Sequence, residues 1–350
     1  MRTALFYVSG HGYGHAVRAM QVGRALAGDH GYKVIMKTAA PRRLFPENMT
    51  IKPGDVDPGP AQLDCLTTDK ENTLRRFSKM VENLERDAEK EMGDVEKHKP
   101  SVIVSDISPL GVEAGVMARL PTIVVANFLW DWILRDYAAE RPSFGAIADF
   151  LTGVYSKATA ILRTPLSGGM EGYDNVIDIP LIARRSAKTK AQARKALGLP
   201  ASGRFALVSF GGMGGDRFFE NIEDRITAFE LLVPGSGRRS GGPEAPHEDL
   251  MAAADVVIGK MGYGLCSELI AARRPLLYTP RDDFIEYKVL ASESRKYISV
   301  EEVPRKEFFE ANLDRRLLNL TAAGHPRGTT PINGARAAAR AIEGFARGFL

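Results

Sequence analysis

Asp255–Glu286, with the sequence DVVIGKMGYGLCSELIAARRPLLYTPRDDFIE, is the stretch that decides the fold. Its first residues are apolar and predict a strand that ends at Ile258, and Gly259–Gly264 predicts a flexible turn before a helix. The free amides at the start of that helix would point at the turn, where a diphosphate fits. Glu268 lies one turn inside the helix, where its carboxylate could accept hydrogen bonds from two ribose hydroxyls. Glycine spacing alone is equally compatible with a strand–turn–helix that binds no ligand.

The chain begins with the same order of elements. Thr3–Val8 is a compact apolar run rich in β-formers, and Ala19–Leu26 has helical apolar spacing. Between them lies Ser9–Arg18, with the sequence SGHGYGHAVR. Taken alone, a glycine turn between a strand and a helix indicates a phosphate-binding loop. Its two histidines, His11 and His15, argue against that role, because a phosphate cradle is built from backbone amides.

Strand and helix patterns alternate along both halves of the chain. Because each predicted strand is followed by a helix, the pattern predicts right-handed crossovers and parallel sheets. Residues 41–69 are rich in proline, glycine and aspartate and predict an irregular excursion with short strands. Further strands are predicted at 33–37, 101–105, 121–127, 158–162, 176–179, 205–210, 229–233, 256–258 and 275–278, and further helices at 71–97, 111–119, 144–155, 184–197, 247–254, 265–272 and 332–345.

A change in composition separates two domains. Residues 184–197 are basic and alanine-rich, and they lead into a glycine- and proline-containing linker at 198–203. We therefore expect an α/β protein with two Rossmann-like, doubly wound domains, the first at 1–185 and the second at 186–330, followed by a closing helix within 331–350. Two such domains facing each other would form a cleft at the carboxyl ends of both sheets.

Composition excludes several classes of protein. The net charge of +4 is too small to indicate nucleic-acid binding. The two cysteines, Cys65 and Cys266, are far apart and form neither a disulfide framework nor a zinc pattern, which favours a reducing cytoplasm. No apolar run is long enough for a transmembrane segment, and the first run ends too soon for a signal peptide. No His/Cys cluster has ligand spacing, so we expect no metal site.

Asp249–Glu286 resembles the donor-nucleotide motif of the two-domain B-fold (GT-B) glycosyltransferases. It is most similar to the glycosyltransferase-like N-terminal half of plant L-arabinokinases and related bacterial proteins. The likeness is carried by GKMGYGLCSE (259–268) and RRPLLYTPRDDFIE (273–286), and GHGYGHAVR (10–18), SDISP (105–109) and NFLWDWI (127–133) fall where that family has them. It implies a last helix that crosses back to the first domain. No kinase phosphate loop of the form GxxxxGK[ST] is present, so kinase activity is not implied.

The resemblance assigns the second domain to the donor. It implies that the diphosphate is bound by Gly262, Tyr263, Gly264 and Ser267 and the ribose by Glu268, while Asp283 and Glu286 hold the donor sugar. Glu286 stands where many nucleotide-sugar transferases have glutamine, so the sugar stays open. Ser209, Gly211 and Gly212 resemble the serine/glycine turn that contacts the phosphates.

The resemblance assigns the first domain to the acceptor. His15 stands where inverting family members have a histidine general base, and Asp106, at the end of the SVIVS strand, would fix its tautomer. The alternative is that both histidines only cap the turn, and that the aromatic residues near 130 belong to the core. Residues expected to contact the acceptor are His11, Gly12, Tyr13, Arg18, Asn127, Trp130 and Asp131.

The sequence thus predicts a cytoplasmic, metal-independent glycosyltransferase that needs no cofactor. The expected donor is a nucleotide sugar, a UDP-sugar by family analogy. The expected acceptor is a hydroxyl of a small molecule, a lipid or a glycan, and transfer is expected to invert the anomeric centre. A nucleotide-sugar hydrolase and a non-catalytic nucleotide-sugar-binding protein remain alternatives. Peripheral membrane contact and the oligomeric state stay open.

Overall fold

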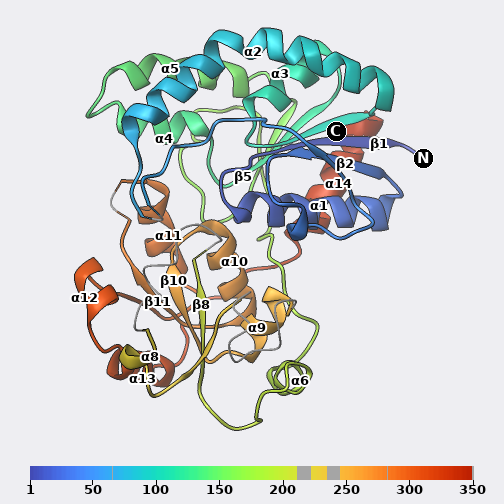
Figure 1. The fold of residues 1–350 in the computed structure, drawn as a ribbon. Helices are drawn as coiled ribbons and strands as arrows, with labels where there is room; N and C mark the ends of the chain where they lie inside the picture. The colour runs from blue at the N-terminus through green and yellow to red at the C-terminus, as the bar shows by residue number, and fades with distance from the viewer. Residues whose placement is uncertain (65, 211–221, 235–244, 282, 349–350) are drawn as a thin grey trace. The chain divides into compact units, whose positions relative to one another are not determined.

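The computed structural model describes residues 1–64, 66–210, 222–234, 245–281 and 283–348 (Figure 1). The chain forms two compact units. Unit 1 comprises Met1–Leu63, Thr68–Ile182 and Pro331–Leu350, and unit 2 comprises Asp64–Thr67 and Ala183–Thr330. The chain passes into unit 2 at Ala183, slightly before the predicted start at residue 186.

Unit 1 contains a parallel sheet of seven strands in the order β3-β2-β1-β4-β5-β6-β7. The order reverses between β1 and β4, which makes their carboxyl ends the switch point where open α/β sheets bind ligands. The central strands are apolar and buried along their length, as parallel strands covered on both faces require. The strands are β1 (Thr3–Val8), β2 (Lys33–Thr38), β3 (Thr50–Pro53), β4 (Val102–Asp106), β5 (Thr122–Ala126), β6 (Ala160–Arg163) and β7 (Val176–Asp178).

Helices cover both faces of this sheet (Figure 1). The last helix, α14, packs against α1, so the chain returns to the first unit as predicted. Small residues of α14, Ala338 and Ala339, let the two helices approach closely over the sheet. On one face lie α1 (Tyr13–His30) and α14 (Gly334–Arg347), and on the other α2 (Lys70–His98), α3 (Pro109–Met117) and α5 (Ser143–Tyr155); α4 (Trp130–Tyr137) packs on α5, and a 3-10 turn, η1, spans Arg42–Leu44.

Unit 2 contains a second parallel sheet, with a different strand order. Its five strands follow the order β12-β11-β10-β8-β9, so the switch point lies between β8 and β10. Apolar residues of α12 and α13, including Phe308 and Leu317, pack on one face. The strands are β8 (Phe205–Ser209), β9 (Glu230–Leu232), β10 (Val256–Lys260), β11 (Leu276–Thr279) and β12 (Val300–Glu302), and the helices are α6 (Lys190–Ala196), α8 (Ile222–Arg225), α9 (His247–Ala253), α10 (Tyr263–Ala272), α11 (Glu286–Ser294), α12 (Arg305–Glu310) and α13 (Asp314–Ala322).

One predicted helix was wrong in its first half. We expected a helix over 184–197, but α6 begins at Lys190, behind a capping box formed by Thr189 and Gln192. The preceding residues form ion pairs instead: Arg184 contacts Glu268 and Glu248, and Lys188 contacts Asp249. These tertiary contacts override the helix propensity of the segment.

Candidate active site

The carboxyl ends of β1 and β4 meet at the switch point of the first sheet. The backbone N–H of Ser9, just past β1, donates to the carbonyl of Asp106, the last residue of β4. Helix α1 starts four residues later, with Gly12 as its N-cap at φ 85°, a backbone conformation that favours glycine. This turn places His15 in the first turn of α1, beside the end of β4.

His15 and Arg18 both contact the carboxylate of Asp106. His15 Nδ1 lies 2.7 Å from Asp106 Oδ1, so the contact that we predicted from topology is present. Arg18 donates to both oxygens of the same carboxylate, through Nε to Oδ2 and Nη2 to Oδ1, each at 2.8 Å. Because an ionised carboxylate only accepts hydrogen bonds, Nδ1 donates in this contact, and whenever the ring is neutral Nε2 is its basic nitrogen. The arrangement holds an imidazole ready to accept a proton.

The charge of Asp106 is retained although the side chain is buried. Burial would raise the pKa of Asp106, but the charges of Arg18 and then of His15, together with their hydrogen bonds, bring it below the ordinary value. Asn127, which follows β5, adds a further contact, since its Oδ1 accepts from Arg18 Nη1 at 2.6 Å. Arg18 is thus engaged with Asp106 and Asn127, and these contacts hold the dyad in place.

Sequence reasoning missed Asp57, a buried carboxyl group in the same region. Asp57 is the second aspartate of an Asp55-Val56-Asp57 pair; Asp55 is exposed, whereas Asp57 accepts a hydrogen bond from Ser9 Oγ at 3.0 Å. Burial raises the pKa of Asp57 to about 7, and the nearby His15 and the hydrogen bond from Ser9 offset part of that effect. An aspartate in a proline- and glycine-rich segment is indistinguishable by sequence from an ordinary turn residue.

The residues predicted to contact the acceptor occupy two different environments. His11, Gly12 and Tyr13 are half-buried on the loop before and at the start of α1, and the Tyr13 hydroxyl is hydrogen-bonded to Arg43. Trp130 has an exposed fraction of 0% and packs edge-on against His11, with ring centroids 5.6 Å apart. Its rings therefore support the histidines and present no face to a sugar in this structure.

Asp131 has its own buried contacts. Its Oδ2 accepts hydrogen bonds from the hydroxyls of Tyr173 at 2.7 Å and Thr152 at 3.1 Å. Burial raises the pKa of this carboxyl group, although these two hydrogen bonds lower it. Asp131 thereby ties α4 to α5 and to the loop at Tyr173.

In unit 2, the ends of β8 and β10 meet closely at the switch point. Gly259 of β10 is paired with Ser209 of β8, and a Cβ on Gly259 would lie 2.0 Å from the Ser209 carbonyl oxygen. Glycine is therefore required here for the two strand ends to approach. The approach places the Ser209 hydroxyl near the turn that leads into α10, whose N-cap is Gly262.

Glu268 of α10 is held by an arginine and a histidine side chain. Arg184 Nε lies 2.9 Å from Oε1, and His247 Nδ1 lies 2.8 Å from Oε2. His247 Nε2 is in turn 3.1 Å from Ser209 Oγ. Burial would raise the pKa of Glu268, but the neighbouring His247 and then Arg184 bring it below the ordinary value. His247 is the first residue of α9, behind the N-cap Pro246, within the helix that we predicted at 247–254.

The other residues assigned to the donor lie along the same edge. Gly262, Tyr263 and Gly264 form the start of α10, and the hydroxyl of Ser267 donates to the Gly264 carbonyl at 2.9 Å. Asp283 follows β11, 3.4 Å from Arg281, and the buried Glu286 begins α11. Gly211 and Gly212 lie outside the described residues.

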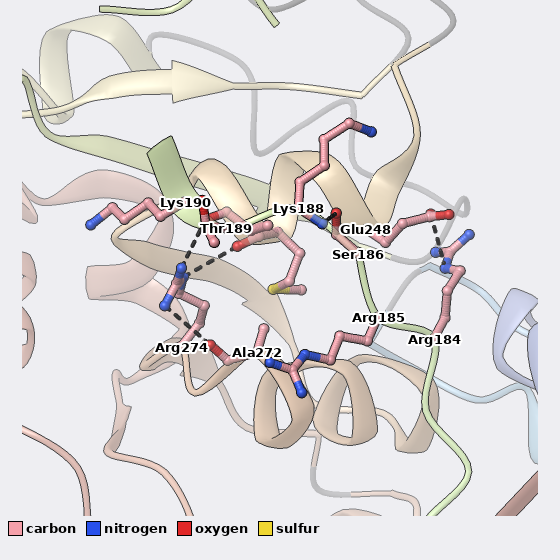
Figure 2. A pocket seen from close by; sticks show the side chains of 11 residues that line it. Arg184, Arg185, Ser186, Lys188, Thr189, Lys190, Glu248, Ala272 and Arg274 are labelled. Carbon is pink, nitrogen blue, oxygen red and sulfur yellow. Dashed lines mark hydrogen bonds and ion pairs between the residues drawn. The ribbon is translucent and has the colours of Figure 1, made fainter. Parts of the chain in front are cut away.

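A small basic hollow lies beside this network (Figure 2). Segment 184–190, α9 and the end of α10 line it, and its volume is about 130 Å³. Several of its cations are already engaged: Lys188 pairs with Asp249, Lys190 pairs with Asp255, and Arg274 donates to carbonyls at the ends of α9 and α10. Such a hollow is too small for a nucleotide, for which pockets of about 300–1,000 Å³ are typical.

Two further classes of site were sought among the described residues. No group of three or more His, Cys, Asp or Glu side chains there is arranged to hold a metal ion. Within the same residues, every helix is too short or too polar to cross a membrane.

Comparisons with known proteins show which proteins this chain resembles. No protein-family model matches the chain. It is 30% identical over 299 residues to an L-arabinokinase of Arabidopsis thaliana, a match that covers 80% of this chain and 28% of that protein. The chain thus spans just over a quarter of the length of the curated relative that it matches.

Solved glycosyltransferases share the architecture of the whole chain. The spinosyn rhamnosyltransferase SpnG complexed with thymidine diphosphate matches at a TM-score of 0.58 and 14% identity, over 99% of this chain and 96% of that one. The calicheamicin glycosyltransferase CalG4 matches at 0.59 and 12% identity, over 99% and 96%. SnogD from Streptomyces nogalater matches at 0.53 and 16% identity, over 98% and 99%. The chain therefore has the two-domain B-fold of glycosyltransferases.

Proposed function

We propose that the protein transfers a sugar from a nucleoside-diphosphate donor to an acceptor hydroxyl, with His15 as the general base. The observation that carries the proposal is the 2.7 Å contact between His15 Nδ1 and Asp106 Oδ1 at the switch point of the first sheet. The shared fold with glycosyltransferases supports the reaction class, and a base within such a site has the chemistry that direct displacement needs.

The proposed reaction is a single displacement. His15 Nε2 takes the proton of the acceptor hydroxyl while that oxygen forms a bond to the anomeric carbon. The bond between the anomeric carbon and the diphosphate oxygen breaks, and its electron pair leaves with the nucleoside diphosphate. The imidazolium formed on His15 is stabilised by the ionised Asp106. Attack opposite the leaving group inverts the anomeric centre.

The donor assignment rests on unit 2. The helix start at Gly262–Gly264 offers amides to a diphosphate, and the ionised Glu268 lies one turn further along α10. We propose a UDP-sugar as the first donor to test, with Asp283 and Glu286 near the sugar. A related fold holds thymidine diphosphate, so the test set must include several bases.

The test is turnover with a panel of UDP-, GDP- and dTDP-sugars, with and without a mixed set of hydroxyl acceptors. We expect release of nucleoside diphosphate that depends on an acceptor, and a product whose anomeric configuration, measured by NMR, is inverted. Stoichiometric release of free sugar without acceptor would replace the transferase by a hydrolase, in which the same dyad activates water. Tight nucleotide binding with no turnover of any donor would indicate a binding protein.

A further inference from the structure

Glu268 lies between an arginine and a histidine side chain that sequence reasoning did not connect with it. Each oxygen of its carboxylate has a separate contact, Arg184 Nε at 2.9 Å from Oε1 and His247 Nδ1 at 2.8 Å from Oε2. A carboxylate offers about four acceptor positions. The two contacts therefore leave about two positions, which is the number needed for two hydroxyls of one ligand.

The two side chains come from different elements. Arg184 lies in the irregular segment before α6, where it also contacts Glu248 at 3.3 Å. His247 begins α9, and its Nε2 reaches Ser209 Oγ at 3.1 Å. Glu268 is thus fixed from two sides while its own helix, α10, fixes its backbone. A carboxylate restrained in this way loses little side-chain entropy when a ligand binds.

We propose that His247 and Arg184 are positioning residues that hold Glu268 in one ionised orientation and thereby make the site select a ribonucleotide over a 2′-deoxyribonucleotide. This inference rests on the proposed function, because it assumes a nucleoside-diphosphate donor at Glu268. With both ribose hydroxyls present, a restrained carboxylate accepts two hydrogen bonds at once. With the 2′-hydroxyl absent, one of the two is lost.

The experiment measures dissociation constants by calorimetry for the full chain. ADP, CDP, GDP and UDP are compared with their 2′-deoxy counterparts and with dTDP. For the ribonucleotide that binds most tightly, we expect at least about tenfold discrimination against its 2′-deoxy form, the scale of one hydrogen bond to a charged group. His247→Ala and Arg184→Ala are expected to weaken ribonucleotide binding by about tenfold each and to leave binding of the 2′-deoxy form changed by less than about threefold.

Matched variants separate positioning from a general loss of structure. Arg185→Ala removes an adjacent arginine that lines the same hollow but has no ion pair among the described residues, and it should leave the ratio of the two affinities unchanged. His247→Asn keeps an N–H near the place of Nδ1, whereas His247→Gln keeps one near the place of Nε2. Rescue of the ratio by Asn and not by Gln would locate the effect in the contact with Glu268.

The outcomes are distinct. If the wild type binds ribonucleotides and the ratio stays constant in His247→Ala and Arg184→Ala, the positioning inference is overturned and the proposed function stands. If the wild type binds dTDP more tightly than the ribonucleotides, the positioning inference is likewise overturned and the proposed function stands. If the wild type binds no nucleoside diphosphate, both are overturned. Should His247→Ala fail to fold, the comparison of the Asn and Gln variants decides.

Discussion

Each unit places a histidine beside a carboxylate at the switch point of its own sheet, but the two networks are built differently. In unit 1, Asp106 is the last residue of a central strand, and His15 and Arg18 come from one turn of a single helix. In unit 2, Glu268 lies within a helix, and its partners come from a separate helix and from an irregular segment. The first network depends on the core of the unit, and the second depends on peripheral segments.

The difference in burial indicates a difference in role. Arg18 is 2% exposed and holds both oxygens of Asp106, so this carboxylate has little capacity left for a ligand. The side chains of Arg184 and His247 are 19% and 22% exposed, and each contacts one oxygen of Glu268. A closed network suits a base that must keep one tautomer, and a more open one suits a carboxylate that must also accept hydrogen bonds from a ligand.

The largest expected effect is a difference in catalytic activity between variants of His15 and His247. His15→Ala should lower turnover by about 10²–10⁴-fold, the usual contribution of a general base, and leave the affinity for the nucleoside diphosphate unchanged. His247→Ala should have the reverse pattern, with weaker donor binding and a smaller loss of turnover at saturation. Steady-state kinetics with calorimetry on both variants measures this. Equal losses of turnover in the two variants would remove the distinction between base and binding residue.

The first network was predictable from sequence, because strand order fixes it. Once Thr3–Val8 and Val102–Asp106 are neighbouring parallel strands, their carboxyl ends must meet at one edge, and the turn after the first strand must bring His15 there. The apolar runs that form these strands are unambiguous, so the bounds of β1 were predicted without error.

The second network was not predictable, because helix placement and ion pairs decide it. His247 begins a short helix after a proline- and glycine-rich stretch, and the sequence contains no periodic pattern that would predict where this helix packs. Segment 184–188 has the composition of a helix but is irregular, because carboxylates on other elements hold it. Helices α4 and α11–α13 also went unpredicted, since each is only six to nine residues long, which is too short for a clear periodic pattern.

The second largest effect is expected on the free energy of unfolding, in which the carboxylates of Asp106 and Glu268 should differ. Asp106→Asn removes the carboxylate charge that the buried Arg18 contacts through two of its nitrogens, which should destabilise unit 1 by about 3–5 kcal/mol at pH 7. Glu268→Gln should cost only about 1 kcal/mol, because Arg184 is partly exposed and retains Glu248. Both tryptophans, Trp130 and Trp132, belong to unit 1, so fluorescence in a denaturant titration follows that unit and circular dichroism follows both. Similar costs for the two variants would contradict the difference in burial.

A pH-dependent effect is expected for Asp57, which has no counterpart among the residues of unit 2 that the structure describes. Burial raises the pKa of Asp57 from 3.8 to about 7, so the folded protein binds this proton more tightly than the unfolded chain. The associated stability is present below pH 4 and is lost as the pH rises through about 7. At about 1.4 kcal/mol per pKa unit, Asp57→Asn should be more stable than the wild type by up to about 4 kcal/mol at pH 8 and indistinguishable from it near pH 4.

The contribution of Glu268 to stability should depend on pH in the opposite direction from that of Asp57. Its pKa is lowered, so its contribution is present above the pKa of the unfolded chain and is lost as the pH falls through the folded value. The deficit of Glu268→Gln should therefore shrink in acid, whereas the advantage of Asp57→Asn appears in base. Melting temperatures from about pH 2 to about pH 8 test both, and a pH-independent difference between Asp57→Asn and the wild type would show that Asp57 does not titrate in this range.

The smallest effects concern the neutral residue at the edge of each network. Asn127 accepts a hydrogen bond from the charged Arg18 inside the core, so Asn127→Ala should cost about 1.5–3 kcal/mol. Ser209 is half-buried and water can replace its contact with His247, so Ser209→Ala should cost less than about 1 kcal/mol. Denaturant titrations of the two variants provide the measurement. If Ser209→Ala were the costlier of the two, the network of unit 2 would be part of the structural core, and the view of Glu268 as a carboxylate available to a ligand would have to be abandoned.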